Sequence, residues 1–164
     1  LEIGARHLTV STCGIVPKIK EFSKGKYQYN LAISLHAPND QLRSKLMPIN
    51  HAYPLKDLML ALKEYSEENN RRITFEYILL KDVNDQLEHA QQLAHLVKGM
   101  NAYVNLIPYN SVDEHGFKSV NFKDAMRFYD QLTRLGVKCT LRQEMGGDID
   151  AACGQLRAKA EGKL

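Results

Sequence analysis

The sequence of 164 residues has few cysteines and no long apolar run, and each shortage excludes a class of protein. No apolar stretch approaches the ~20 residues with which a helix crosses a membrane. The three cysteines, Cys13, Cys139 and Cys153, are an odd number at wide spacings. That pattern fits neither a disulfide framework nor a CxxC metal site, so it predicts a reducing, cytoplasmic location.

Two families of nucleotide and metal motifs are also missing. The chain has no Gly-rich phosphate loop with Walker or Rossmann spacing, and it has no HExxH zinc motif. His89 and His95 do not share a helix face. Lysines and arginines are scattered, and the net charge of +3 permits a nucleic-acid partner without requiring one.

The composition is that of one folded domain. Hydrophobic residues make up 44% and charged residues 25% of the chain, the balance of a soluble globular protein. The length is sufficient to bury a core. Because the chain starts at Leu1 without an initiator methionine, we expect it to be part of a longer protein.

Strand-like segments alternate with helical segments along the chain. The expected strands are 7–12, 30–36, 72–80, 103–110 and 137–142. The expected helices are 16–23, 40–47, 54–68, one that opens at Asp85 with Glu88 completing a capping box, 122–136, and a last one carrying Cys153. This alternation predicts an α/β fold with a parallel sheet, either doubly wound or barrel-like.

One face of nearly every expected strand is small or polar. In segment 30–36, Leu31, Ile33 and Leu35 alternate with small or polar residues. A buried parallel strand should be apolar on both faces, and a closed barrel fills its interior with Val, Ile and Leu. Exposure at a sheet edge would explain one such strand but not four. The pattern therefore favours an open barrel with a ligand-lined interior.

Polar residues also gather where these strands end, which is where α/β folds hold their functional groups. The residues at these positions are Ser11, Ser34, His36, Glu76, Asn110 and Arg142. Each has a structural alternative. The serines could fill space, His36 could be a structural histidine, and Asn110 could make a turn. Glu76 and Arg142 could pair with each other. The shared face and shared end favour a site.

Cys153 lies in the stretch DIDAACGQLR, just after a Gly-Gly pair. Its place near the start of a helix favours a thiolate, whereas Asp148 and Asp150 oppose one. On these grounds alone, Cys153 could be either a packed small residue or a nucleophile.

Five stretches together resemble a known family. STCGIVPKI, LAISLHAPNDQLRSKLMPIN, FEYILLKDVND, VNLIPYN and GGDIDAACGQL are similar, in this order, to the carboxyl-terminal half of the radical SAM methyltransferases that modify C2 of adenine in 23S rRNA and some tRNAs. The resemblance runs from about Leu8 to Arg157. It implies half of an open, TIM-like radical SAM barrel over residues 1–164, with a methyl-carrying segment at 145–164.

The resemblance also implies roles for single residues. Cys153 corresponds to the catalytic cysteine that becomes S-methylated and carries the methyl group to RNA. The S-adenosylmethionine contacts correspond to Ser11, Ser34, Leu35, His36 and Asn110. The implied partners are 23S rRNA, tRNA, an electron donor such as flavodoxin, and the missing amino-terminal half of the same enzyme, with no membrane.

The family's chemistry explains the thiol. C2 of adenine is electron-poor and cannot attack a methyl cation donor, so one S-adenosylmethionine methylates the cysteine. A second one, cleaved at a 4Fe–4S cluster, yields a radical that removes hydrogen from the S-methyl group, and the resulting carbon radical adds to C2. The CxxxCxxC cluster motif is absent here, so we expect the isolated chain to bind no metal and to be inactive.

Three other interpretations remain open at this point. The first is the related family that methylates C8 of adenine and confers ribosomal antibiotic resistance, although FEYILL and LIPYN are closer to the C2 branch. The second is a non-catalytic RNA-binding half-barrel. The third is an unrelated sugar-phosphate barrel enzyme, which the missing phosphate loop disfavours.

Overall fold

The computed structural model describes residues 8–25, 29–109 and 116–142, and every structural statement below concerns these residues. They form one sheet of five parallel strands in the order β1-β2-β3-β4-β5. The strands are β1 Thr9–Thr12, β2 Asn30–Ser34, β3 Ile73–Leu79, β4 Ala102–Pro108 and β5 Cys139–Leu141. The expected parallel α/β sheet is confirmed.

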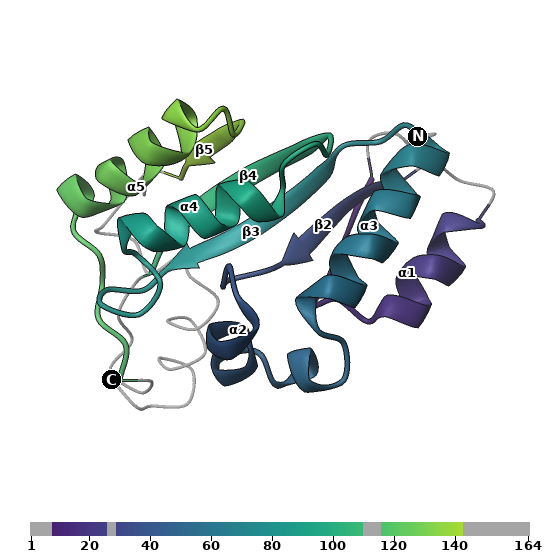
Figure 1. Ribbon diagram of the computed structural model, residues 1–164, viewed down its shortest axis with the longest axis horizontal. Helices are drawn as coiled ribbons and strands as arrows, with labels where there is room; N and C mark the ends of the chain where they lie inside the picture. The colour runs from purple at the N-terminus through teal and green to yellow at the C-terminus, as the bar shows by residue number, and fades with distance from the viewer. Residues whose placement is uncertain (1–7, 26–28, 110–115, 143–164) are drawn as a thin grey trace, which may run out of the picture.

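The helices lie between consecutive strands of this sheet. They are α1 Val16–Ser23, α2 Asp40–Leu46, the 3-10 helix η2 Pro48–His51, α3 Leu55–Asn69, α4 Leu87–Leu96 and α5 Phe122–Arg134. Because crossovers between parallel strands are right-handed and this sheet grows in one direction only, its helices lie on one face. Figure 1 shows α3 and α4 in front of the strands. A doubly wound sheet would reverse its strand order, so the arrangement is that of a partial barrel.

The core lies between the sheet and these helices. Along β3, Ile73, Phe75, Tyr77 and Leu79 are completely buried, while the residues between them are half-buried. The ring of Tyr77 stacks on Phe128 of α5 with centroids 5.5 Å apart. The alternation expected from the sequence is therefore real: one face of β3 packs on helices and the other does not.

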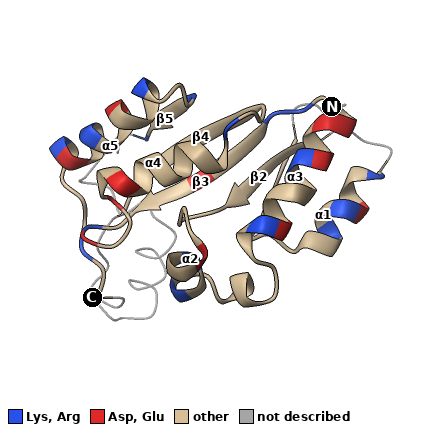
Figure 2. Ribbon diagram, in the orientation of Figure 1, with Lys and Arg blue, Asp and Glu red and all other residues tan. Residues whose placement is uncertain are grey.

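The first strand departs from this pattern. Leu8 and Val10, the two apolar residues of the expected strand 7–12, are 43% and 38% exposed. In the described part of the chain β1 pairs only with β2, so it is an edge strand with fewer neighbours to cover it. Most charged residues lie on the helices and loops, where the ribbon of Figure 2 is blue or red. No helix in the described ranges is both long and apolar enough to cross a membrane.

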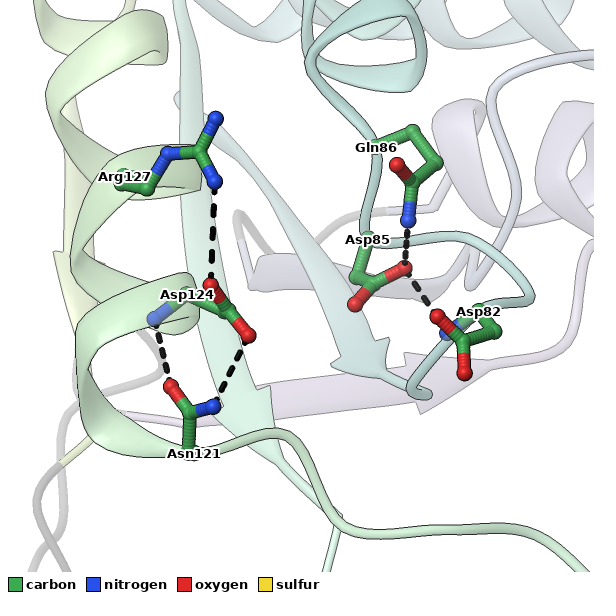
Figure 3. Close-up of polar contacts among 6 residues, drawn as sticks. All are labelled: Asp82, Asp85, Gln86, Asn121, Asp124 and Arg127. Atoms are coloured by element: carbon green, nitrogen blue, oxygen red, sulfur yellow. Dashed lines mark hydrogen bonds and ion pairs between the residues drawn. The ribbon is translucent and has the colours of Figure 1, made fainter.

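The expected capping box from Asp85 to Glu88 is wrong. Helix α4 begins at Leu87, and its N-cap is Gln86, whose backbone N–H donates to His89 Nδ1 at 3.3 Å. Asp85 closes the preceding turn instead, accepting from the backbone N–H of Asp82 at 3.0 Å and from Gln86 Nε2 at 2.7 Å (Figure 3). Both bonds hold Asp85 in the turn before the helix, and Gln86 takes the N-cap position instead.

Helix α5 begins as its sequence predicts. Asn121 accepts from the backbone N–H of Asp124 at 2.8 Å, and its Nδ2 donates to the Asp124 carboxylate at 2.9 Å (Figure 3). Arg127 adds a contact of 3.8 Å to the same carboxylate. The first of these bonds satisfies a backbone donor that the first turn of a helix leaves without a partner, and the other two hold the capping side chains in place.

Candidate functional site

A row of polar residues crosses four strands on the face away from the helices. Strand register places Ser34 beside Glu76, Glu76 beside Asn105, and Asn105 beside Thr140. Thr140 Oγ1 donates to Asn105 Oδ1 at 3.2 Å, and Asn105 Nδ2 donates to Glu76 Oε2 at 3.0 Å. Hydrogen bonds therefore join three of the four side chains. We call Ser34, Glu76, Asn105 and Thr140 the polar row.

His36 is fixed just beyond the end of β2. Its backbone has a φ of 56°, its Nδ1 accepts from the backbone N–H of Ile78 at 3.1 Å, and its carbonyl accepts from Asn84 Nδ2 at 2.8 Å. Its own N–H donates to the Glu76 carbonyl at 3.3 Å. Because Nδ1 accepts a hydrogen bond, the proton of the neutral ring is on Nε2.

The charge state of His36 follows from its surroundings. Burial and, to a smaller extent, the positive charge of Arg43 together lower the pKa of His36 from 6.5 to about 4. At neutral pH the ring is thus uncharged. It offers a ligand an N–H donor and no positive charge.

Arg43 of α2 holds the ends of β1 and β2 together. It is completely buried, and its guanidinium donates to the carbonyls of Cys13 at 2.8 Å, Leu35 at 3.2 Å and Ser34 at 3.3 Å. A fourth bond of 3.1 Å reaches Asn50 Oδ1. Sequence reasoning missed this residue, because an arginine on a short helix is ordinarily solvated and no pattern in the sequence marks it as buried.

Asn84 has a similar role after β3 and was also missed. Its side chain is completely buried; Oδ1 accepts from the Leu80 N–H at 2.7 Å, and Nδ2 donates to the carbonyls of Ile78 and His36 at 2.7 and 2.8 Å. Its carbonyl accepts from the Tyr77 hydroxyl at 2.8 Å. The only signal was its place in the turn sequence KDVND.

The remaining residues expected at the site differ in their placement. Ser11 is exposed on the edge strand beside Ala32. Leu35 is completely buried, so only its backbone can contact a ligand, and its N–H already donates to the Glu76 carbonyl at 3.0 Å. The remaining two, Asn110 and Cys153, lie outside the described residues.

Glu76 and Arg142 do not form the pair that was one alternative. The Glu76 carboxylate accepts from Asn105, and within the described ranges no ion pair connects it to Arg142, whose side chain is exposed. The backbone N–H of Arg142 donates to the Leu106 carbonyl at 2.8 Å, which extends the pairing of β4 with β5.

Gly14 lies where the loop after β1 approaches the core. Its φ is 103°, and a Cβ there would come within 3.2 Å of Leu58 and 3.3 Å of the Arg43 guanidinium. The loop therefore requires glycine at this position, both for its backbone conformation and for space.

The described residues offer no metal centre. No group of three or more His, Cys, Asp or Glu side chains in these ranges could hold a metal ion. Cys139 lies on the helix-facing side of β5, where burial raises the pKa of its thiol and Thr133 Oγ1 lies 3.7 Å from its sulfur. A raised pKa makes this thiol a poor nucleophile.

A cavity of about 490 Å³ lies at the other end of the strands, where β4 and β5 begin. Its lining includes His95, Lys98, Ala102 and Lys138. It contains none of the candidate residues. In open α/β sheets ligands bind at the carboxyl ends of the strands, so we assign the site to His36 and to Ser34 at the end of β2. The polar row continues this site from Ser34 across the middle of β3 and β4, so the expected place of Glu76 at a strand end is wrong.

Comparisons with known proteins show what the whole chain is similar to. No protein-family model matches the chain. The chain is 58% identical over 163 residues to a probable dual-specificity RNA methyltransferase RlmN of Spiroplasma citri, covering 99% of this chain and 47% of that protein. Against the protein of the same name from Enterococcus faecalis, the identity is 57%, with coverage of 97% and 45%.

Solved structures lead to the same group of proteins. A radical SAM methyltransferase from Sphaerobacter thermophilus superposes with a TM-score of 0.88 at 45% identity, over 93% of this chain and 45% of that one. A domain of the pyruvate-formate lyase-activating enzyme from Bacteroides vulgatus, at 16% identity and a TM-score of 0.63, shares the fold. The chain is thus similar over nearly its whole length to RlmN proteins and to a radical SAM methyltransferase, and it spans a little under half of their length.

Proposed function

We propose that this chain is the carboxyl-terminal half of a dual-specificity radical SAM methyltransferase that methylates C2 of adenine in 23S rRNA and tRNA. The observation that carries the proposal is the 58% identity to an RlmN protein over 99% of the chain. Residues 1–164 form half of the barrel, and segment 145–164 carries the methyl group. Because ribosomes and tRNA are its substrates, the enzyme acts in the cytoplasm.

The strand ends suit S-adenosylmethionine chemically. The ligand carries amino, carboxylate and ribose hydroxyl groups, and the site offers an uncharged imidazole at His36, a hydroxyl at Ser34 and a carboxylate at Glu76. We assign the contacts to Ser11, Ser34, Leu35, His36 and Asn110. When bound, S-adenosylmethionine supplies the methyl group and a source of adenosyl radical.

The chain's own residues keep this site in shape. Arg43 holds the Ser34 and Leu35 carbonyls, and the Glu76 carbonyl accepts the N–H groups of Leu35 and His36. The segment that faces the ligand is thus tied to its neighbours at its backbone. Such preorganisation spares the ligand the cost of ordering the segment when it binds.

The described residues do not fit a 4Fe–4S cluster, because they lack three converging thiols. We assign the cluster ligands to the amino-terminal half of the enzyme, outside this chain. The electron donor, a flavodoxin-like protein, would act on that half.

Cys153 is the proposed methyl carrier. Its thiolate would attack the methyl group of S-adenosylmethionine, forming a C–S bond and releasing S-adenosylhomocysteine. An alanine has no atom that can accept the methyl group. Cys139 does not substitute for it, because its thiol packs against the core on the helix side of the sheet and burial raises its pKa.

Mass spectrometry of the RNA product tests the proposal. The full-length enzyme should produce 2-methyladenosine and contain S-methylated Cys153, whereas the Cys153→Ala enzyme should give no methylated product. Cys139→Ala is the matched control and should retain methylation. Formation of 8-methyladenosine would assign the chain to the C8 branch, and a wild-type enzyme that methylates neither RNA would contradict an enzymatic role.

A further inference from the structure

Glu76 is the one charged residue in the five described strands. It lies in the middle of β3, on the face away from the helices, and is half-buried. A carboxylate in the centre of a sheet loses much of its hydration, which is unfavourable unless donors replace the lost water. The position therefore calls for a partner that supplies donors.

The polar row supplies only one such donor. In the part of the chain that the structure describes, Asn105 Nδ2 donates to Glu76 Oε2 at 3.0 Å, and no lysine, arginine or histidine forms an ion pair with this carboxylate. Asn105 is itself oriented, because its Oδ1 accepts from Thr140 at 3.2 Å. The row thus holds Glu76 in one orientation while leaving acceptor capacity for another molecule.

The backbone of Glu76 ties this carboxylate to the segment proposed to bind S-adenosylmethionine. The Glu76 carbonyl accepts from Leu35 N at 3.0 Å and His36 N at 3.3 Å, and strand register places Glu76 beside Ser34. Neighbouring strands lie about 4.8 Å apart. A ligand that contacts Ser34 and His36 on this face is therefore within reach of the carboxylate.

We propose that Glu76 binds S-adenosylmethionine by accepting hydrogen bonds from its ammonium group or its ribose hydroxyls. This inference rests on the proposed function. Both groups are donors, and a carboxylate is an acceptor for either. Asn105 and Thr140 act as positioning residues that hold the carboxylate toward the ligand.

Equilibrium dialysis of the full-length enzyme tests this role. Glu76→Gln keeps the size of the side chain and can still accept from Asn105, so the fold should persist. Its dissociation constant for S-adenosylmethionine should rise roughly tenfold to a hundredfold, the worth of a hydrogen bond to a charged group. Glu67→Gln removes an equal charge from the exposed face of α3 and should leave the dissociation constant unchanged.

Binding of 5′-methylthioadenosine, which keeps the ribose but lacks the amino acid portion, locates the contact. An equal loss of affinity for both ligands in the Glu76→Gln enzyme places the contact at the ribose. A loss confined to S-adenosylmethionine places it at the ammonium group. Either result supports the inference.

Two results would overturn it, and they differ. If Glu76→Gln binds S-adenosylmethionine within twofold of wild type, the role of Glu76 is wrong and the proposed function stands. If the wild-type enzyme binds no S-adenosylmethionine, the proposed function fails and this inference fails with it. If Glu76→Gln does not fold, Glu76→Asp serves as the second variant, because it keeps the charge but moves the carboxylate away from the ligand by one methylene. Unchanged affinity for S-adenosylmethionine in that variant would also overturn the role of Glu76.

Discussion

The two faces of the sheet differ in composition although they are built from the same strands. The face toward the helices is continuous hydrocarbon, with Phe75, Tyr77 and Leu106 completely buried. The opposite face carries the polar row, and its side chains on β3 and β4 are half-buried. In a sheet with one apolar and one polar face, the apolar face stabilises the fold and the polar face is available to a ligand.

The same division explains why the two faces should respond differently to substitution. Side chains on the helix face contribute through burial and packing, which change the free energy of unfolding. Side chains on the polar face contribute through oriented hydrogen bonds, which change the affinity for a donor-rich ligand. A substitution on the helix face should therefore leave the ligand affinity largely unchanged, and a substitution on the polar face should leave the free energy of unfolding largely unchanged.

The largest change in stability is expected on the helix face. Leu62 of α3 is completely buried, whereas Leu60 of the same helix is 55% exposed. Leu62→Ala in the full-length enzyme should lower the free energy of unfolding by about 2–5 kcal/mol, because it removes buried methyl groups and leaves a cavity. Leu60→Ala, the matched control, should change it by less than about 0.5 kcal/mol.

Denaturant unfolding measures both variants, and dialysis against S-adenosylmethionine at a temperature where both are folded measures their affinity. The affinity of folded Leu62→Ala enzyme should equal that of wild type. If Leu62→Ala instead weakened binding without loss of stability, the division between the faces would be wrong.

A smaller change is expected at His36, and it depends on pH. Its pKa is about 4 in the folded protein and 6.5 otherwise, so between these values the unfolded chain binds more protons than the folded one. Stability due to neutral His36 is thus fully present above pH 6.5 and is lost as the pH falls toward 4. The loss reaches at most about 3 kcal/mol.

The difference between wild type and His36→Asn isolates this effect. Asparagine tolerates the φ of 56° and can accept the Ile78 N–H at its Oδ1, but it does not titrate in this range. Thermal unfolding from pH 7 to pH 4 should show wild type losing stability relative to the variant. A constant difference across that range would show that His36 is not held neutral.

The features that sequence could predict are those set by local patterns. Alternation of apolar and polar residues in segment 72–80 predicted the two faces of β3, and the order of strands and helices predicted a parallel sheet. Strand-end position predicted that Ser34 and His36 lie near each other. Helix α1 was predicted from Val16 to Ser23, as the structure has it.

The features that sequence could not predict depend on contacts between distant segments. Arg43 is buried because three carbonyls from two strand ends converge on it, and no residue near it in sequence indicates that convergence. Asn84 likewise bonds to His36, far away along the chain. The start of α4 was misplaced because an aspartate can either cap a helix or bond within a turn. Asp85 bonds within the turn before α4.

A crystal structure of the full-length enzyme with S-adenosylmethionine tests the central claim most directly. The account predicts that the ligand lies against the polar face at the carboxyl ends of the strands, with its polar atoms about 3 Å from groups of Ser34, His36 and Glu76. A ligand seated among the helices, or in the cavity beside Lys98 and Lys138 at the other end of the strands, would contradict it.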